Sequence, residues 1–501
     1  MKILLKIKIR QLLISVLIAG LSAFTVNAQR GYEIKVKITP LHDTTIVLGH
    51  HFGTSIYPDD TARLDKNGKG VFSKRNKTLT GGMYIIYLPN KAYFDFLIND
   101  KQNFSIENDT SDLFKKAKFS NSPDNDIFFD YQYFLSDKRD SLKELQNKKK
   151  NAKTDSEKED ITKQMQAVDK EVASRIAKII SDHPTTLAAK FIKATRDVEI
   201  PDPPKDENGK IKDSLFQYRY YRSHYFDNLD LSDPRMLRMP PVIYENKILN
   251  YIDKVIPQIP DSINPELDKL IAKSRTSDEL FRFMLVTLFN HYTKSQIMGF
   301  DAVQVYLAEK YYVPEAKWSD TAYMTKLKDF VKRTKPLLLG KVAPDIQLVR
   351  VPTEHFIEAA DSIPMKKDPY VGSFFNLHEI QSKFTILYFW DADCGHCKKA
   401  TPVMYDVAQK LKSKDVEVIA ISLQFGQEGK VKWINYINEN KYYDWINAWN
   451  PYDYKFKELY DVSSTPQIFI LDKDKKIIAK RIGPEQVTEI IDVFLNRDSK
   501  K

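Results

Sequence analysis

Cysteine is nearly absent from this sequence, because its 501 residues include only Cys394 and Cys397, three positions apart. No second cysteine pair exists, so a structural zinc site with two such pairs is excluded, and the histidines are scattered apart from His50-His51. An inert disulfide between the two cysteines is the alternative, although so short a loop would restrict the unfolded chain little. The pair therefore favours reactive chemistry over a structural role.

Long apolar runs are also absent beyond the N-terminal segment, since none approaches the ~18 residues that a membrane-spanning helix needs. That segment has four basic residues within its first ten, an apolar stretch over 11–24, and Val26-Asn27-Ala28 before Gln29. This order predicts a secretory signal peptide over residues 1–28, cleaved after Ala28. An uncleaved anchor is the alternative, but the apolar stretch is shorter than the ~20 residues of a spanning helix. Because no cysteine follows it to carry a lipid, we expect a periplasmic protein without stable membrane insertion after cleavage.

A strong excess of charge of one sign is lacking too. The formal charge of +10 falls to +6 once the four basic residues of the signal segment are removed. Basic and acidic residues are interspersed and no nucleic-acid-binding motif is present, so we expect a solvated surface and no nucleic-acid partner. We interpret the run Lys148-Lys149-Lys150 as the tip of a helical hairpin.

The two cysteines lie in the run YFWDADCGHCKKATP, residues 388–402, between two different periodicities. Residues 384–390 are rich in β-branched and aromatic side chains, which predicts a buried strand, whereas residues 398–413 place apolar side chains at helical spacing. Cys394 therefore lies at a helix start, where free backbone N–H groups and the helix dipole favour a thiolate. Cys397 lies one helical turn further, close enough to attack a mixed disulfide at Cys394. The pattern predicts a nucleophilic Cys394 and a resolving Cys397.

Residues 340 to about 497 resemble the thioredoxin-fold modules of thiol-disulfide oxidoreductases of the ResA and TlpA type. Four separated segments carry the resemblance, and they are GKVAPDIQL (340–348), the run from Trp390 through the cysteines to Pro402, the inserted segment 424–452, and YDVSSTPQIFILDKDKKIIAKRIG (460–483). The last segment also predicts a hairpin from its residues alone, with strands at 467–471 and 477–482.

The resemblance implies a thioredoxin fold and thiol-disulfide exchange without a diffusible cofactor or a metal. It places Thr465-Pro466, with a cis-proline, opposite the disulfide, where the two residues would pair with the substrate backbone. It also assigns Trp390 to the substrate-binding surface, where the indole packs the site. A peroxiredoxin site is disfavoured, because Asp391 stands three residues before Cys394 where that class carries threonine.

Three residues depart from the thioredoxin pattern. Tyr388 replaces a buried aspartate that accepts a proton in thioredoxins, and an unperturbed tyrosine pKa of ~10 makes it a poor substitute. Asp393 replaces a tryptophan just before Cys394, where a carboxylate raises the thiol pKa. His396 precedes the second cysteine, as in disulfide isomerases, and favours the thiolate. We expect a pKa for Cys394 below the ordinary ~8.5 and a disulfide less reducing than that of thioredoxin, which a redox potential at or below thioredoxin's would refute.

The fold class is multidomain. Residues 29–112 contain segments of alternating or apolar side chains and predict a small antiparallel β domain. Residues 122–335 turn to helical periodicity and predict an α-helical middle domain, in which the charge-dense stretch 137–170 is an antiparallel helix pair or a solvated arm. Residues 340–501 are the α/β redox domain. The first two domains resemble accessory regions of unknown function in Gram-negative envelope proteins.

Together these features predict a periplasmic thiol-disulfide oxidoreductase whose partners are disulfide-containing envelope proteins. Because a bacterial periplasm is kept oxidising, a reductase there also needs a membrane thiol carrier that supplies electrons. A disulfide oxidase or isomerase would use the same residues. An envelope binding or scaffold protein with a redox-sensitive thioredoxin-like module is a further interpretation, against which the intact dithiol argues.

Overall fold

The structure is a computed structural model that describes residues 31–359 and 372–498. The predicted signal peptide and its cleavage site lie outside the described residues. The chain packs as two compact units, one comprising the described residues up to Ile256 with Ala272–Phe281, the other Pro257–Ile271 with the residues from Arg282 onward. This division falls within the helical part of the chain, and the residue limits of the three domains stay predictions.

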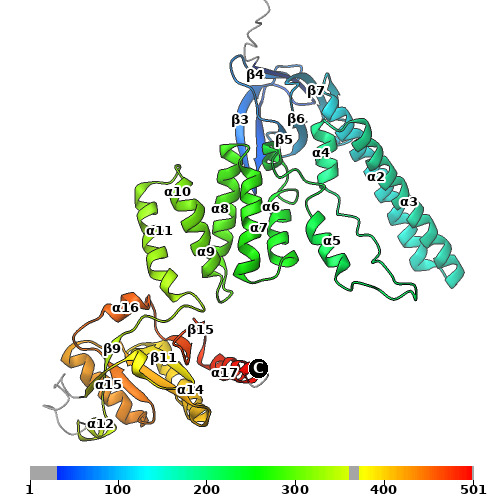
Figure 1. Cartoon of the computed structure of the whole chain (residues 1–501). Coiled ribbons are helices and arrows are strands. Elements are labelled where there is room, and N and C mark those ends of the chain that lie inside the picture. The colour runs from blue at the N-terminus through cyan, green and yellow to red at the C-terminus, as the bar shows by residue number, and fades with distance from the viewer. Residues whose placement is uncertain (1–30, 360–371, 499–501) are drawn as a thin grey trace, which may run out of the picture. The chain divides into compact units, whose positions relative to one another are not determined.

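Two four-stranded sheets, β4-β1-β7-β8 and β3-β2-β5-β6, begin the first unit (Figure 1). Their strands are β1 (Tyr32–Thr39), β2 (Thr45–Phe52), β3 (Ser55–Arg63), β4 (Lys69–Lys74), β5 (Gly82–Tyr87), β6 (Tyr93–Ile98), β7 (Asn103–Asp109) and β8 (Lys118–Ser120). In β1 the alternation of side chains buries Ile34, Val36 and Ile38 on one face. The pairing is antiparallel, as predicted, except that β1 and β7 run parallel.

A long pair of helices follows the sheets. The helices α2 (Pro123–Asn151) and α3 (Asp155–Asp182) lie side by side (Figure 1). The helix-pair interpretation of residues 137–170 is therefore confirmed, and Lys148, Lys149 and Lys150 occupy the last turn of α2. The connection between the two helices is short, and α3 begins with a capping box. The Thr154 side chain accepts a hydrogen bond from the Glu157 backbone N–H, and the Glu157 side chain accepts one from the Thr154 backbone N–H.

The remaining helices before the C-terminal domain are shorter. They are α4 (Leu187–Ala194), α5 (Phe216–His224), α6 (Glu245–Asn250), α7 (Pro260–Ser274), α8 (Asp278–Lys294), α9 (Asp301–Leu307), α10 (Val313–Glu315) and α11 (Thr321–Thr334). Among the described residues, none of the helices combines the length and the apolar character that crossing a bilayer requires.

A seven-stranded sheet of order β10-β9-β13-β12-β11-β14-β15 forms the centre of the C-terminal domain. Its strands are β9 (Gln347–Arg350), β10 (Ser373–Asn376), β11 (Phe384–Trp390), β12 (Val416–Ser422), β13 (Ile446–Trp449), β14 (Gln467–Asp472) and β15 (Ile477–Lys480). The helices are α12 (Thr353–Ala359), α14 (Gly395–Leu411), α15 (Gly426–Asn440), α16 (Lys455–Leu459) and α17 (Pro484–Asp498). The parallel unit β11-α14-β12, followed by the antiparallel hairpin β14-β15 and α17, is the thioredoxin-like fold predicted for this domain.

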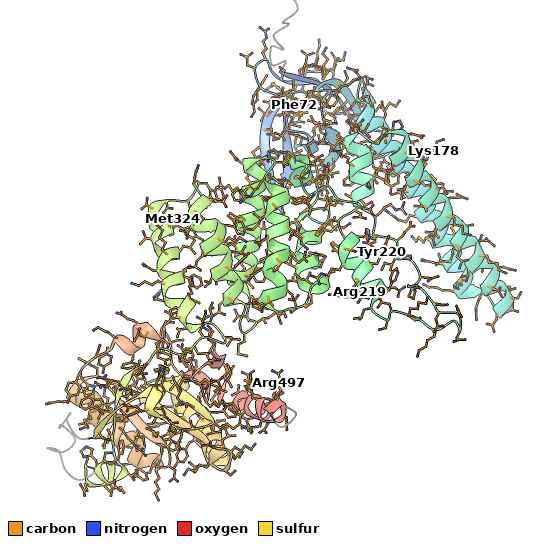
Figure 2. The ribbon with its side chains drawn as sticks, viewed as in Figure 1. Phe72, Lys178, Arg219, Tyr220, Met324 and Arg497 are labelled. Carbon is orange, nitrogen blue, oxygen red and sulfur yellow. The ribbon has the colours of Figure 1, made fainter. Side chains whose placement is uncertain are left out.

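The strand β11 is buried on both faces, which explains its nearly continuous apolar sequence. Ile386, Tyr388 and Trp390 face one core, to which α14 and α17 contribute, whereas Leu387 and Phe389 face the other. The helices α14 and α17 pack against each other, and Arg497 marks α17 in Figure 2. Because Trp390 pairs with Ser422 at the ends of the parallel strands β11 and β12, the loops that follow these strands meet at one edge of the sheet. This edge carries both cysteines.

Candidate active site

The two cysteines lie where β11 leads into α14, as the sequence predicted. Cys394 is the N-cap of α14, and its Sγ accepts a hydrogen bond from the backbone N–H of Cys397 at 3.4 Å. Cys394 is half-buried, whereas Cys397, in the first helical turn, is fully buried. Both residues are free thiols in this structure. A substrate can therefore reach the first sulfur and not the second.

The surroundings of the two sulfurs shift their pKa values in opposite directions. Burial opposes ionisation of Cys394, but hydrogen bonds from the Thr465 side chain and from the backbone N–H groups of Cys397 and His396 outweigh it, so the pKa of Cys394 is lowered. At Cys397 burial dominates, and together with the neighbouring Cys394 it raises the pKa to about 11. Cys394 is thus the thiol that ionises first.

Thr465 lies against Cys394, and the peptide bond between Thr465 and Pro466 is cis. When it is protonated, the Cys394 thiol donates to the Thr465 carbonyl oxygen at 3.4 Å. The pair comes directly before β14, whose antiparallel pairing with β11 brings it to the edge where the dithiol lies. The predicted position facing the cysteines is therefore observed, and pairing with a substrate backbone stays a prediction.

Trp390 and Tyr388 support the site from within the core. The Trp390 ring packs against the rings of Tyr388 and Tyr436, at centroid distances of 6.4 and 5.4 Å. Its predicted packing role is observed, but the predicted contact with substrate is corrected, because an indole that is 1% exposed does not reach a substrate.

Tyr388 does not replace the missing buried carboxylate. Its hydroxyl shares a hydrogen bond of 2.8 Å with Thr401 Oγ1. Burial is the main cause that raises the pKa of Tyr388 above its ordinary value, so the phenol keeps its proton at neutral pH. The Cys397 sulfur instead accepts a hydrogen bond from the backbone N–H of Asp391 at 3.4 Å, and a hydrogen bond from the Thr465 side chain also favours its ionised form.

Asp393, next to Cys394, is paired with a cation that the sequence analysis missed. Lys432 Nζ lies 3.1 Å from Asp393 Oδ2 and 3.3 Å from Glu428 Oε1. The hydrogen bond from Lys432 is the main cause that lowers the pKa of Asp393, so this carboxylate is ionised. Lys432 is 39 positions from Asp393 in the chain, and the only local signal was its i,i+4 spacing from Glu428 on α15.

Gln424, also missed from the sequence, fastens the dithiol loop to the loop after β12. Its Nε2 donates to Asp391 Oδ1 at 2.5 Å, and the same oxygen accepts the Asp393 backbone N–H at 2.7 Å. The Leu423 N–H adds a hydrogen bond of 2.9 Å to the Trp390 carbonyl. Gln424 comes two residues after the end of β12, and no local signal in the sequence pairs it with Asp391, which lies 33 positions away.

His396 is exposed and contributes to Cys394 through its backbone N–H. Tuning of the thiolate by its imidazole, which was predicted from the sequence, stays a prediction. Within residues 31–359 and 372–498, no group of three or more His, Cys, Asp or Glu side chains is arranged to hold a metal ion.

Three family models each match a different part of the chain. Residues 381–477 match a family model described as thioredoxin-like. Residues 145–332 match a domain of unknown function (DUF5106), and residues 32–128 match another (DUF4369).

Curated relatives match about a quarter of the chain. The thiol-disulfide oxidoreductase ResA of Bacillus thuringiensis (strain Al Hakam) is 30% identical over 128 residues, which cover 25% of this chain and 69% of that protein. The protein of the same name from Bacillus cereus (strain ZK / E33L) is 29% identical over 136 residues, with the same coverage of 25% and 69%. Among solved structures, a domain of a possible thiol-disulfide isomerase from Cytophaga hutchinsonii is 33% identical, covers 33% of this chain and 99% of that chain, and has a TM-score of 0.27.

The two thiols are expected to react with iodoacetamide in different pH ranges, because the thiolate is the reactive form. In the full chain with Cys397→Ser, the alkylation rate of Cys394 should reach half its maximum below the ~8.5 of an ordinary cysteine. With Cys394→Ser, the midpoint for Cys397 should lie well above that value, because burial holds its proton. Coincident midpoints at the ordinary value would contradict the opposite shifts.

Substitutions in the Asp393–Lys432 pair should each shift the pH dependence of Cys394 alkylation in a defined direction. Asp393→Asn should lower the pKa of Cys394, because a neighbouring negative charge is lost, and Lys432→Met should raise it, because that charge is no longer compensated. Both side chains are exposed to solvent, which screens their charges, so each shift should be below about one pH unit.

Two further variants control this experiment. In the Asp393→Asn background, Lys432→Met should have little effect, because Lys432 acts through the carboxylate. Lys410→Met, at the exposed far end of α14, should leave the profile of Cys394 unchanged. Equal shifts from Lys432→Met with and without Asp393 would show that the pair is not the cause.

Proposed function

Since the chain belongs, through its C-terminal domain, to the family of thiol-disulfide oxidoreductases that includes ResA, we propose that it reduces disulfide bonds of envelope proteins in the periplasm. The observation that carries the proposal is the pair of unlike thiols at the start of α14. Cys394 is accessible and has a lowered pKa, whereas Cys397 is buried and holds its proton. Two-step disulfide exchange requires these two groups, an accessible nucleophilic thiol and a second thiol beside it that can attack the mixed disulfide.

In the first step, the Cys394 thiolate attacks one sulfur of the substrate disulfide. A bond forms between Cys394 and that sulfur, and the other substrate sulfur leaves as a thiolate. In the second step, Cys397 loses its proton and attacks the Cys394 sulfur, which releases the second substrate thiolate. Two electrons pass in total to the substrate. Its two thiolates take up protons from solvent, which match the protons that Cys394 and Cys397 lost, and the Cys394–Cys397 disulfide is the oxidised product.

The first step prepares the second. The Cys394 sulfur is one of the causes that raise the pKa of Cys397, through its charge and through a hydrogen bond. A mixed disulfide at Cys394 carries no charge, so its formation removes this contribution and favours ionisation of Cys397. Attachment of a substrate thereby makes Cys397 easier to ionise, while burial, the main cause, still raises its pKa.

The predicted signal segment, residues 1–28, supports a periplasmic location. In that oxidising compartment, a membrane thiol carrier would return two electrons to the Cys394–Cys397 disulfide after each turnover, and no diffusible cofactor is needed. The two domains of unknown function would position the client or the carrier.

Two alternative functions are each favoured by a particular feature of the chain. The His396 position, shared with disulfide isomerases, favours an oxidase or isomerase, because a more stable thiolate makes the disulfide more oxidising. A binding or scaffold role is favoured by the size of the part that precedes the redox domain, where residues 32–128 and 145–332 match domains of unknown function.

Trapping of covalent intermediates tests the proposal. The full chain with Cys397→Ser, expressed with its own N-terminal segment in a Gram-negative host, should accumulate mixed disulfides with several proteins, because the second step is blocked. These adducts should appear on non-reducing gels after acid quenching and thiol blocking, and should disappear with dithiothreitol. Cys394→Ser, alone or with Cys397→Ser, is the matched control and should trap none. A scaffold would trap none with Cys397→Ser either.

The resting state of the wild-type chain in the same cells separates the two directions of electron flow. A reductase should rest mainly as the dithiol, so that a mass-tagged maleimide adds to both cysteines once the cells are quenched with acid and the protein is denatured. An oxidase should rest as the disulfide and take up no tag until it is reduced.

A further inference from the structure

Phe425 is the most exposed large apolar side chain in the described part of the chain, with 69% of its surface accessible. A single exposed apolar residue is ordinary on a protein surface, so its exposure alone says little. Its position is informative because it follows Gln424, the residue that fastens the loop after β12 to the dithiol loop.

The order of the strands places Cys394 between Phe425 and Thr465. The strand β11, which leads to Cys394, lies between β12 and β14 in the sheet. Phe425 comes three residues after the end of β12, and Thr465 comes two residues before the start of the antiparallel β14, so both reach the edge where β11 ends. Neighbouring strands are about 4.8 Å apart and an extended chain advances about 3.3 Å per residue, so a substrate residue one or two positions from the attacked cysteine can reach Phe425.

The Phe425 ring is held in place from one side and open on the other. It packs edge-on against Tyr454, with ring centroids 4.8 Å apart and planes at 74°. The Tyr454 hydroxyl donates to the Gln424 carbonyl oxygen at 2.7 Å, which joins the supporting ring to the residue before Phe425. Tyr454 in turn packs against the buried Phe456, at 5.7 Å. An aromatic ring held in this way loses little side-chain entropy when a partner covers it.

We propose that Phe425 is a specificity-determining residue that binds an aromatic or large aliphatic side chain beside the target cysteine of a client polypeptide. The inference rests on the proposed disulfide exchange at Cys394. The occupant is an extended segment of a client polypeptide, in which the side chain one or two residues from the half-cystine reaches the ring while the disulfide sulfur meets Cys394. A small disulfide such as hydroxyethyl disulfide covers the sulfur and does not reach the ring.

Two peptides test this inference, each joined through its cysteine to 5-thio-2-nitrobenzoate in a mixed disulfide. One has phenylalanine beside the cysteine and the other has serine there. Attack of the Cys394 thiolate on the peptide sulfur releases the coloured nitrobenzoate thiolate, and Cys397 then displaces the peptide thiol. In a single turnover, the reduced full chain should attack the phenylalanine peptide with a second-order rate constant about tenfold larger, which corresponds to about 1.4 kcal/mol. Phe425→Ser should bring this ratio close to one, and Phe425→Leu should retain most of it.

Controls separate docking from damage to the dithiol. Reduction of hydroxyethyl disulfide should be unchanged in both Phe425 variants. Tyr93→Ser, at an aromatic residue of the N-terminal sheets that is 54% exposed, should leave the peptide ratio unchanged. Equal rates of the wild-type chain on both peptides, or a ratio that survives Phe425→Ser, would overturn the inference, as would an equal slowing of all substrates in that variant. A wild-type chain that attacks none of the disulfides would instead overturn the proposed exchange reaction.

Discussion

The site depends on the start of α14 at Cys394, where the sulfur caps a helix whose first N–H groups have no partner within the helix. The hydrogen bond from Cys397 N–H to Cys394 Sγ satisfies one of these groups and favours the charged form of the sulfur. The same turn carries Cys397 inward, where burial has the opposite effect on its pKa. One helical turn thereby holds two thiols whose pKa values are shifted in opposite directions, and the proposed reaction follows from this asymmetry.

The sheet supplies the rest of the site by bringing distant segments to one edge. The parallel pairing of β11 with β12 places Gln424 beside Asp391, and the antiparallel pairing with β14 places Thr465 beside Cys394. Both contacts are made within a few residues of a strand end, where the hydrogen bonds of the sheet fix the backbone of the neighbouring strand. The proposed nucleophile is therefore presented from this edge of the sheet, and the segment after β12 extends the edge with Phe425.

Much of the C-terminal domain could be predicted because its signals are local. The buried strand before Cys394, the helical spacing after Cys397 and the hairpin after Pro466 are each contained in one short stretch of sequence. Gln424 and Lys432 could not be predicted in the same way, since they act through partners 33 and 39 positions away that only the folded sheet brings near. The parallel pairing of β1 with β7 likewise depends on a contact between strands far apart in the chain. The burial of Trp390, by contrast, agrees with the buried strand predicted over residues 384–390. The roles of the two N-terminal domains remained open because no motif in them carries chemistry.

Rapid mixing of the reduced full chain with oxidised glutathione, followed by acid quenching and peptide mass spectrometry, tests most directly whether the two thiols act in sequence. Glutathione should be attached to Cys394 at the earliest times and should then leave as the Cys394–Cys397 disulfide forms. Glutathione found first on Cys397, or an adduct on Cys394 that persists while Cys397 remains a thiol, would contradict the division of roles between the accessible nucleophile and the buried resolving thiol.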